Sequence, residues 1–184
     1  DQERARELLR TINAGPRAGS PLGARVRWPI PAEGSVMGAR GEGTGGGGVW
    51  YAINMTLIWA AARIDPAMGW DEWRRMSLTS HAAAYPDVWE GTLSGPDALN
   101  APESPRPGRT WVMPQIGGMQ PFPVNNLHSH AQPLLAYLRL AGMEPTARGT
   151  LKIGAGAAWS SRTFRVDEDG HGQLHAQGPV VLET

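Results

Sequence analysis

The stretch that decides the fold is 49-VWYAINMTLIWAAARI-64. Its residues are apolar almost all round, which is typical of a helix buried on most of its sides. Asp65-Pro66 ends this helix, and residues 70–84 (WDEWRRMSLTSHAAA) predict a second one. The short connection indicates an antiparallel helical hairpin. In the second helix, successive residues of one stripe are three or four positions apart: Trp70, Trp73, Ser77 and His81.

Further helices and strands lie on either side of this hairpin. Residues 2–13 predict a helix, and residues 126–141 predict another, with Gly142 as its C-terminal stop. Alternating patterns then predict short strands at 149–154, 161–166, 172–176 and 179–183, with a turn at 167–170. We expect a mainly α body over residues 1–148, followed by a small antiparallel sheet over residues 149–184.

Two segments have no periodic pattern. Residues 16–48 are irregular and end in the run GARGEGTGGGG, which indicates either a flexible linker or a very close approach of the backbone to something else. These glycines lack the Lys-Ser/Thr ending of a phosphate loop. Residues 85–125 are rich in proline and predict a long loop, a length that is usually functional in a compact domain.

These few helices do not make a self-contained bundle. The all-round apolar helix 49–64 needs more neighbours than they offer. We therefore expect the chain to be the C-terminal part of a larger helical domain, or to be completed by a partner chain.

The composition excludes some classes of protein. Lys+Arg and Asp+Glu number 17 each, so the chain has no net positive charge that would attract nucleic acid or an acidic membrane surface. The chain has no cysteine, no membrane-span pattern and no signal-peptide pattern, so we expect a soluble protein, either cytoplasmic or periplasmic. Glycine and proline number 24 and 16 of 184 residues, but eight tryptophans argue against disorder.

The first candidate chemistry lies in 85-YPDVWEGTLSGPDALN-100. Hydrolysis of a glycosidic bond needs two carboxyl groups, and Asp87, Glu90 and Asp97 are available here. They lie among Trp89, Ser94 and Asn100, types that bind a sugar ring face and its hydroxyls. The alternative is an ordinary turn at Gly95-Pro96-Asp97.

Histidines and arginines give weaker candidates. The pair His128 and His130, with other histidines, could form a zinc site, but the chain has no cysteine and no His-Glu-x-x-His spacing. We therefore predict no metal and no cofactor. Arg106 and Arg109 could hold a phosphate or a carboxylate, although a solvated proline-rich loop explains them as well.

The order of three motifs resembles the C-terminal third of the cellobiose phosphorylase family. Its relatives include chitobiose and cellodextrin phosphorylases and the phosphorylase-like region of cyclic β-1,2-glucan synthases. The motifs are GGGGVWYAINMTLIWAAA, then YPDVWEGTLSGPDA, then NNLHSHAQPLLAYLRLAGMEPTARGTLKIG. The similarity covers roughly residues 40–155 and rests on the collinear order, including Leu140-Ala141-Gly142, Pro145, Gly149, Leu151 and Ile153 of the last motif.

The resemblance implies the C-terminal part of an (α/α)6 barrel with β-sheet material at its end. It also implies an enzyme that acts by inversion on glucans or related oligosaccharides. The family's general acid comes from a preceding part of the barrel, so we expect it outside these residues. The resemblance adds Trp50 and Tyr51, at the glycine-led helix start, to the candidate substrate-binding residues Trp89, Ser94, Asn100, Arg109, His128 and His130.

Departures from the family favour a hydrolase. The family's His after the helix start falls at or beside Ala52, and its phosphate-binding Thr-Gly pair matches His128-Ser129. The family's glutamine on the phosphate side falls near Gly91, next to Glu90. We therefore expect an inverting glycoside hydrolase with Glu90 as general base and Asp97 as second candidate.

Three alternatives stay open. The first is a phosphorylase that holds phosphate through His128, His130 and Arg109. The second is a non-catalytic glycan-binding module with Trp50, Trp89 and Trp111 as stacking platforms. The third is a segment that only completes a partner chain.

Overall fold

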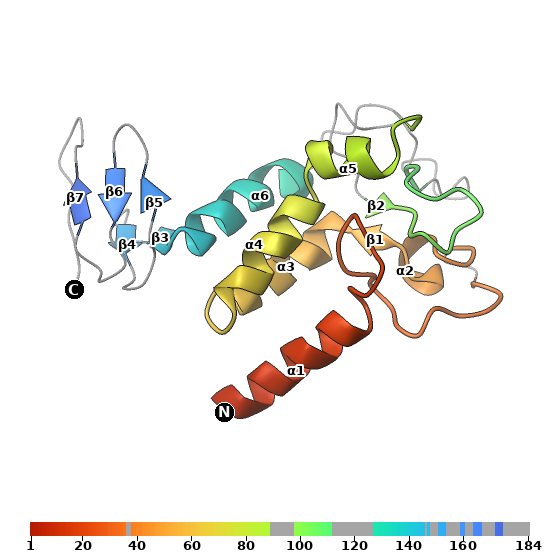
Figure 1. Cartoon of the computed structure of the whole chain (residues 1–184), viewed down its shortest axis with the longest axis horizontal. Coiled ribbons are helices and arrows are strands. Elements are labelled where there is room, and N and C mark those ends of the chain that lie inside the picture. Colours follow the sequence, from red (N-terminus) through yellow and green to blue (C-terminus); the bar gives the residue numbers. More distant parts are fainter. Residues whose placement is uncertain are drawn as a thin grey trace. The chain divides into compact units, whose positions relative to one another are not determined.

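The computed structural model is mainly helical, with small antiparallel sheets (Figure 1). It describes residues 1–35, 38–88, 98–111, 127–145, 147, 151–153, 159–160, 164–166 and 172–174. The chain divides into two compact units, Asp1–Pro133 and Leu134–Thr184. The division expected from the sequence, after residue 148, lies further along the chain.

The first unit carries most of the helices. They are α1 (Gln2–Ala14), α2 (Gly43–Gly46), α3 (Tyr51–Ala61), α4 (Pro66–Arg75) and α5 (Leu78–Ala84), with strands β1 (Val49–Trp50) and β2 (Ala98–Leu99). Helix α1 matches the predicted helix 2–13, and the side chain of Asp1 caps it by accepting from the backbone N–H of Glu3 (3.0 Å). None of the described helices combines the length and apolar character that crossing a membrane requires.

The predicted helical hairpin is confirmed as α3 and α4, which lie side by side (Figure 1). Asp65 caps α4 by accepting from the N–H of Met68 (3.0 Å), and Pro66 occupies the first turn, where its missing N–H costs nothing. The first helix is shorter than predicted. It begins at Tyr51 because Val49 and Trp50 form β1, and it ends at Ala61.

The predicted single helix 70–84 is wrong in one respect, because it is two helices. Ser77 has extended backbone angles (φ −78°, ψ 154°) and its hydroxyl accepts from the N–H of Ser80 (3.2 Å). Serine competes for backbone hydrogen bonds in this way and favours a helix start over a helix interior. Ser77 therefore ends the run that contains α4 and begins α5.

Helix α3 is apolar on all sides but is covered on one side by the described residues. Asn54, Met55, Ile58 and Ala61 are buried, whereas Ile53 is 45% exposed. The expectation that further helices or a partner chain cover the rest of α3 stays a prediction.

The centre of the first unit is an antiparallel ribbon of four short segments. Val49 pairs with Leu99 in the β1–β2 ladder, Arg25 bridges to Val49, and Thr110 bridges to Leu99. Val49 and Leu99 belong to a buried cluster with Leu22 and Ala101 on one face of the ribbon. The predicted long loop over 85–125 is interrupted by β2 (Ala98–Leu99) and by the bridge at Thr110, which belong to this ribbon, whereas residues 100–109 between them have no regular structure.

The glycine-rich run ends in a close packing of backbone rather than a linker. Gly43–Gly46 make one helical turn, and a Cβ atom at Gly46 would collide with the carbonyl of Ala39. Gly41 has a left-handed φ of 74°, and a Cβ there would lie 2.5 Å from the backbone nitrogen of Ser104. Only glycine allows the two segments to approach this closely.

Helix α6 (Leu127–Leu140) begins in the first unit and continues into the second. It confirms the predicted helix 126–141, and Gly142 follows with a left-handed φ of 76°. The strands of the second unit are β3 (Met143–Pro145), β4 (Leu151–Ile153), β5 (Trp159–Ser160), β6 (Phe164–Val166) and β7 (Gly172–Leu174).

These strands form two antiparallel sheets, β3–β4 and β5–β6–β7. The small antiparallel sheet expected near the end of the chain is thus confirmed, with β3 and β5 as strands that the sequence pattern missed. The predicted strand 179–183 lies outside the described residues.

Candidate functional site

Segment 98–111 is held by side chains from three earlier parts of the chain. Arg25 donates to both carboxylate oxygens of Glu103, from Nε (2.9 Å) and from its terminal nitrogen (2.6 Å). Ser104 Oγ donates to the buried carboxylate of Glu42 (2.8 Å). His81, also buried, hydrogen-bonds through Nε2 to the carbonyl oxygen of Gly108 (2.8 Å). These contacts fix the segment although it contains almost no regular structure.

The Arg25–Glu103 contact also sets the local electrostatics. Burial acts to raise the pKa of Glu103, but the hydrogen bonds and charge of Arg25 outweigh burial and hold the pKa below its ordinary value of 4.5. Burial raises the pKa of Tyr85, and the negative charge of Glu103 adds to this effect. Both side chains therefore keep their ordinary charge states at neutral pH: Glu103 ionised and Tyr85 neutral.

The face of the ribbon opposite the Leu22 cluster carries several of the predicted site residues. Trp50 pairs with Ala98 across the ladder, and the N–H of Trp111 donates to the carbonyl of Ala98 (3.0 Å). The rings of Trp50 and Trp111 meet edge to face, with centroids 6.2 Å apart and an interplanar angle of 75°. Side chains alternate between faces along a strand, so Asn100 and its backbone partner Arg109 follow Ala98 and Trp111 on this same face.

Asn100 is fully buried on this face. Its backbone N–H donates to the carbonyl of Arg109 (2.8 Å), and its side-chain Nδ2 donates to the carbonyl of Arg106 (3.0 Å). Its Oδ1, however, has no hydrogen-bond partner among the described residues, and neither has the buried Nε1 of Trp50. We refer to Trp50 Nε1 and Asn100 Oδ1 as the open pair.

The structure thus brings together three of the predicted substrate-binding residues, Trp50, Asn100 and Arg109. Arg109 is exposed. Tyr51 lies apart from them, because it packs against the Leu22 cluster, where burial raises the pKa of its hydroxyl. Trp111 is only 4% exposed, so it does not present a free ring face for stacking as the glycan-binding alternative expects.

The remaining predicted site residues are not placed. Glu90, Asp97, Trp89 and Ser94 lie outside the described residues. The backbone at His128 and His130 belongs to α6, but their side chains also lie outside the described part. Asp87 is described and is exposed.

Sequence reasoning missed the polar groups that assemble the site. Arg25, Glu42 and His81 hold segment 98–111 from positions far away in the chain. No local sequence pattern predicts contacts between residues so far apart in the chain. One usable signal was the glycine-rich run next to Glu42, for which a close approach of backbone was one of two alternatives.

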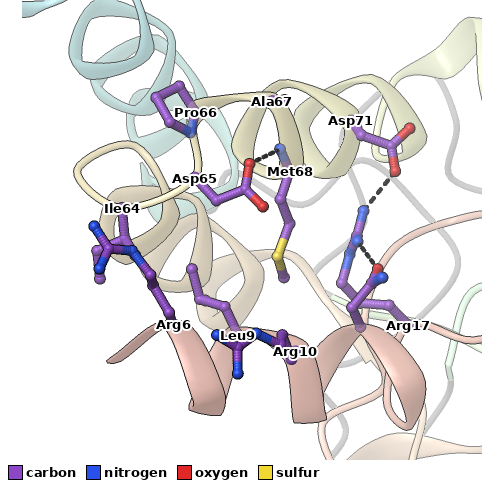
Figure 2. Close-up of a pocket in the computed structure, with 11 residues that line it drawn as sticks. Arg6, Leu9, Arg10, Arg17, Ile64, Asp65, Pro66, Ala67, Met68 and Asp71 are labelled. Atoms are coloured by element: carbon purple, nitrogen blue, oxygen red, sulfur yellow. Dashed lines mark hydrogen bonds and ion pairs between the residues drawn. The ribbon is translucent and has the colours of Figure 1, made fainter. Parts of the chain in front are cut away.

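A groove of about 580 Å³ lies elsewhere in the first unit, between α1 and the start of α4 (Figure 2). Leu9, Ile64 and Met68 supply its apolar part, while arginines face aspartates across it. Arg17 donates to Asp71 (2.5 Å), and Asp65 accepts from the N–H of Met68. The predicted site residues do not line this groove. Its full lining is Arg6, Leu9, Arg10, Asn13, Arg17, Ile64, Asp65, Pro66, Ala67, Met68 and Asp71.

The described side chains contain no group of three or more His, Asp or Glu residues that could hold a metal ion. Comparison with known proteins adds no assignment: no family model, no curated protein and no solved structure matches the chain. The ribbon face with the open pair is the candidate site, because it carries predicted site residues together with buried polar atoms that have no partner among the described residues.

Proposed function

We propose that this chain belongs to a carbohydrate-active enzyme, an inverting glycoside hydrolase that acts on glucan-type oligosaccharides. One observation carries the proposal: the β1–β2 pairing joins the glycine-led motif at Val49 and Trp50 to Leu99 and Ala98, at the end of the 85–100 stretch. These are two of the three motifs that resemble the cellobiose phosphorylase family. Their contact in space supports one site built from both.

The chemistry of this face suits a sugar. Trp50 is half-buried and offers an indole edge and N–H, and Asn100 offers a neutral acceptor. Saccharide sites combine aromatic surface with neutral hydrogen-bonding groups, because sugar hydroxyls both donate and accept. The open pair provides one donor and one acceptor in a buried setting.

In the proposed reaction Glu90 is the general base. An inverting hydrolase needs one carboxyl group that protonates the leaving oxygen and a second that activates water on the opposite side of the sugar ring. Glu90 takes the second role, with Asp97 as the alternative. The general acid comes from elsewhere in the proposed (α/α)6 barrel, whose other helices would cover the exposed side of α3 near Ile53.

The test is Glu90→Gln in the protein that carries this chain. Cleavage of a panel of gluco-oligosaccharides is measured with and without inorganic phosphate. We expect phosphate-independent cleavage to fall about a hundredfold or more, since a positioned general base contributes roughly 10²–10⁴ in rate. Glu7→Gln is the matched control, because Glu7 is an exposed glutamate on α1, outside the 85–100 stretch, and its substitution should leave cleavage unchanged. Near-full activity of Glu90→Gln would contradict the assignment of Glu90 as the general base.

A phosphorylase is the second candidate, because Arg109 places an exposed guanidinium next to Asn100 on the same face. The same assay separates the two enzymes: a phosphorylase cleaves only when phosphate is present and releases a sugar phosphate. Saccharide binding without turnover under both conditions would instead indicate the non-catalytic module.

A further inference from the structure

The open pair has a defined hydrogen-bonding polarity. An indole Nε1–H can only donate, so Trp50 needs an acceptor. A carboxamide has a donor end and an acceptor end, and the two can be exchanged by rotating the group. For Asn100 the neighbour decides the orientation, because the carbonyl of Arg106 can only accept and lies 3.0 Å from Nδ2. The end of Asn100 that remains in the open pair is therefore the acceptor Oδ1.

Both atoms are buried, so each loses its hydration without gaining a partner from the described residues. A buried polar group in this condition costs roughly 1–3 kcal/mol, and native proteins keep few of them. Alternation along the ribbon sets Trp50 and Asn100 at diagonal positions of one face, a spacing that long and aromatic side chains can span. A bound group that reaches both atoms would satisfy them by accepting from Trp50 and donating to Asn100.

A hydroxyl group does both, whereas a phosphate dianion offers acceptor oxygens almost exclusively. Phosphate would place negative oxygens against Asn100 Oδ1, and burying that charge requires a cation or several donors. Arg109, the arginine of this ribbon face, has an exposed side chain, while Asn100 is fully buried. Among the described residues, no buried charge therefore lies beside the open pair on this face, which suits a neutral ligand.

We propose that the open pair is a hydroxyl-selective subsite: Trp50 Nε1 donates to, and Asn100 Oδ1 accepts from, one hydroxyl of a bound saccharide. This inference rests on the proposed function for the class of ligand. It goes further in naming the two atoms that select the ligand and in excluding phosphate from this position. Trp50 and Asn100 are specificity-determining residues here and take no part in bond cleavage.

The experiment is a calorimetric titration of the protein that carries this chain, with Glu90→Gln as the background that prevents turnover, using cellobiose, glucose and inorganic phosphate as ligands. Trp50→Phe keeps a large aromatic ring and removes the single donor. We expect the Kd for cellobiose to rise roughly threefold to tenfold, the usual effect of losing one hydrogen bond. Trp28→Phe is the control, because Trp28 is 47% exposed and stacks on Arg25 away from the open pair. It should bind cellobiose like the unaltered chain.

Asn100→Ala is the second variant, and it should weaken cellobiose binding to a similar degree. If Asn100→Ala does not fold, Trp50→Phe alone decides. An unchanged Kd for Trp50→Phe would overturn the proposal and would mean that the open pair holds only water. Phosphate that competes with cellobiose and binds more weakly to Trp50→Phe would also overturn it, as would a chain that binds neither sugar.

Binding is measured here without turnover, so the two proposals fail separately. Loss of the hydrolase assignment would appear as saccharide binding that still depends on Trp50 but without cleavage. Loss of the subsite would appear as cleavage that Trp50→Phe leaves untouched.

Discussion

Two buried polar groupings in the first unit differ in one respect, the number of hydrogen bonds that they complete. Glu72, which is fully buried, accepts from Arg17 Nε (2.7 Å) with one oxygen and from the backbone N–H of Ala24 (2.5 Å) with the other. Arg17 in turn donates to Asp71 (2.5 Å). In the open pair, by contrast, the donor of Trp50 and the acceptor of Asn100 have no partner in the described part of the chain.

This difference separates a structural role from a binding role. The Arg17–Glu72 ion pair ties the segment after α1 to α4, and both carboxylate oxygens of Glu72 already accept a hydrogen bond within the protein. Its removal should therefore affect folding. The two atoms of the open pair make no hydrogen bond with the described residues that could be lost, so they contribute little to folding but have capacity for a ligand. Three substitutions test this contrast.

The largest effect is expected for Glu72→Ala. It leaves the guanidinium of Arg17, which is 3% exposed, without its buried partner and leaves the N–H of Ala24 without an acceptor. Breaking one side of a buried ion pair costs roughly 3–5 kcal/mol, and Asp71 offsets part of this, so we expect about 3 kcal/mol. Urea denaturation at pH 7 measures the change.

The control for Glu72→Ala is Glu7→Ala, which removes an exposed ion pair with Arg10 on α1. Exposed pairs of this kind contribute little, so we expect no measurable loss. A Glu72→Ala chain as stable as Glu7→Ala would contradict a structural role for the Arg17–Glu72 pair.

An intermediate effect, dependent on pH, is expected for Glu103→Gln. The folded-state pKa of Glu103 lies below its ordinary value of 4.5, so its stabilising contribution is complete above that pH and is lost as the pH falls through the folded pKa. At pH 7 we expect Glu103→Gln to lower the free energy of unfolding by about 1 kcal/mol, through loss of the charge-assisted contact with Arg25.

The measurement is urea denaturation of both chains at several pH values between 7 and 3. The stability difference between them should be constant above pH 5 and should shrink below pH 4.5. A difference that stays constant down to pH 3 would show that the Arg25–Glu103 contact does not depend on the charge of Glu103.

The smallest effect on stability is expected for Trp50→Phe, because Nε1 makes no hydrogen bond with the described residues that could be lost. We expect a change of less than about 1 kcal/mol, mainly from reduced contact with Trp111. Thermal unfolding without ligand measures it, and a loss of more than about 2 kcal/mol would place the indole N–H among the groups that hold the fold.

The helices were largely predictable from the sequence. The pattern at residues 2–13 needed only local information, because the N-cap Asp1 and the periodic Leu8, Leu9 and Ile12 lie within one helix. The same holds for the stop at Asp65-Pro66 and for α6. The break at Ser77 also depends on local interactions. A serine inside a helical pattern can either continue a helix or start a new one, and only the hydrogen bond from the Ser80 N–H to its hydroxyl shows that Ser77 caps α5.

The candidate site was predictable only in part. Asn100 and Arg109 were selected from their side-chain chemistry and Trp50 from the family resemblance, but nothing in the sequence showed that β1 and β2 pair or that Trp111 joins them. Residues 98–111 carry prolines and no period, so they resemble a loop. Their order comes from partners such as Arg25 and Glu42, which lie far away along the chain.

The sequence by itself determined where helices form and stop, because helix propensity, capping and side-chain periodicity act within a few residues. Tertiary structure alone decided that Ala98, Leu99 and Thr110 of a proline-rich stretch join a ribbon, and that one donor and one acceptor there have no partner in the described part of the chain. Those outcomes depend on pairing between segments far apart in the chain, for which the chain carries no local signal.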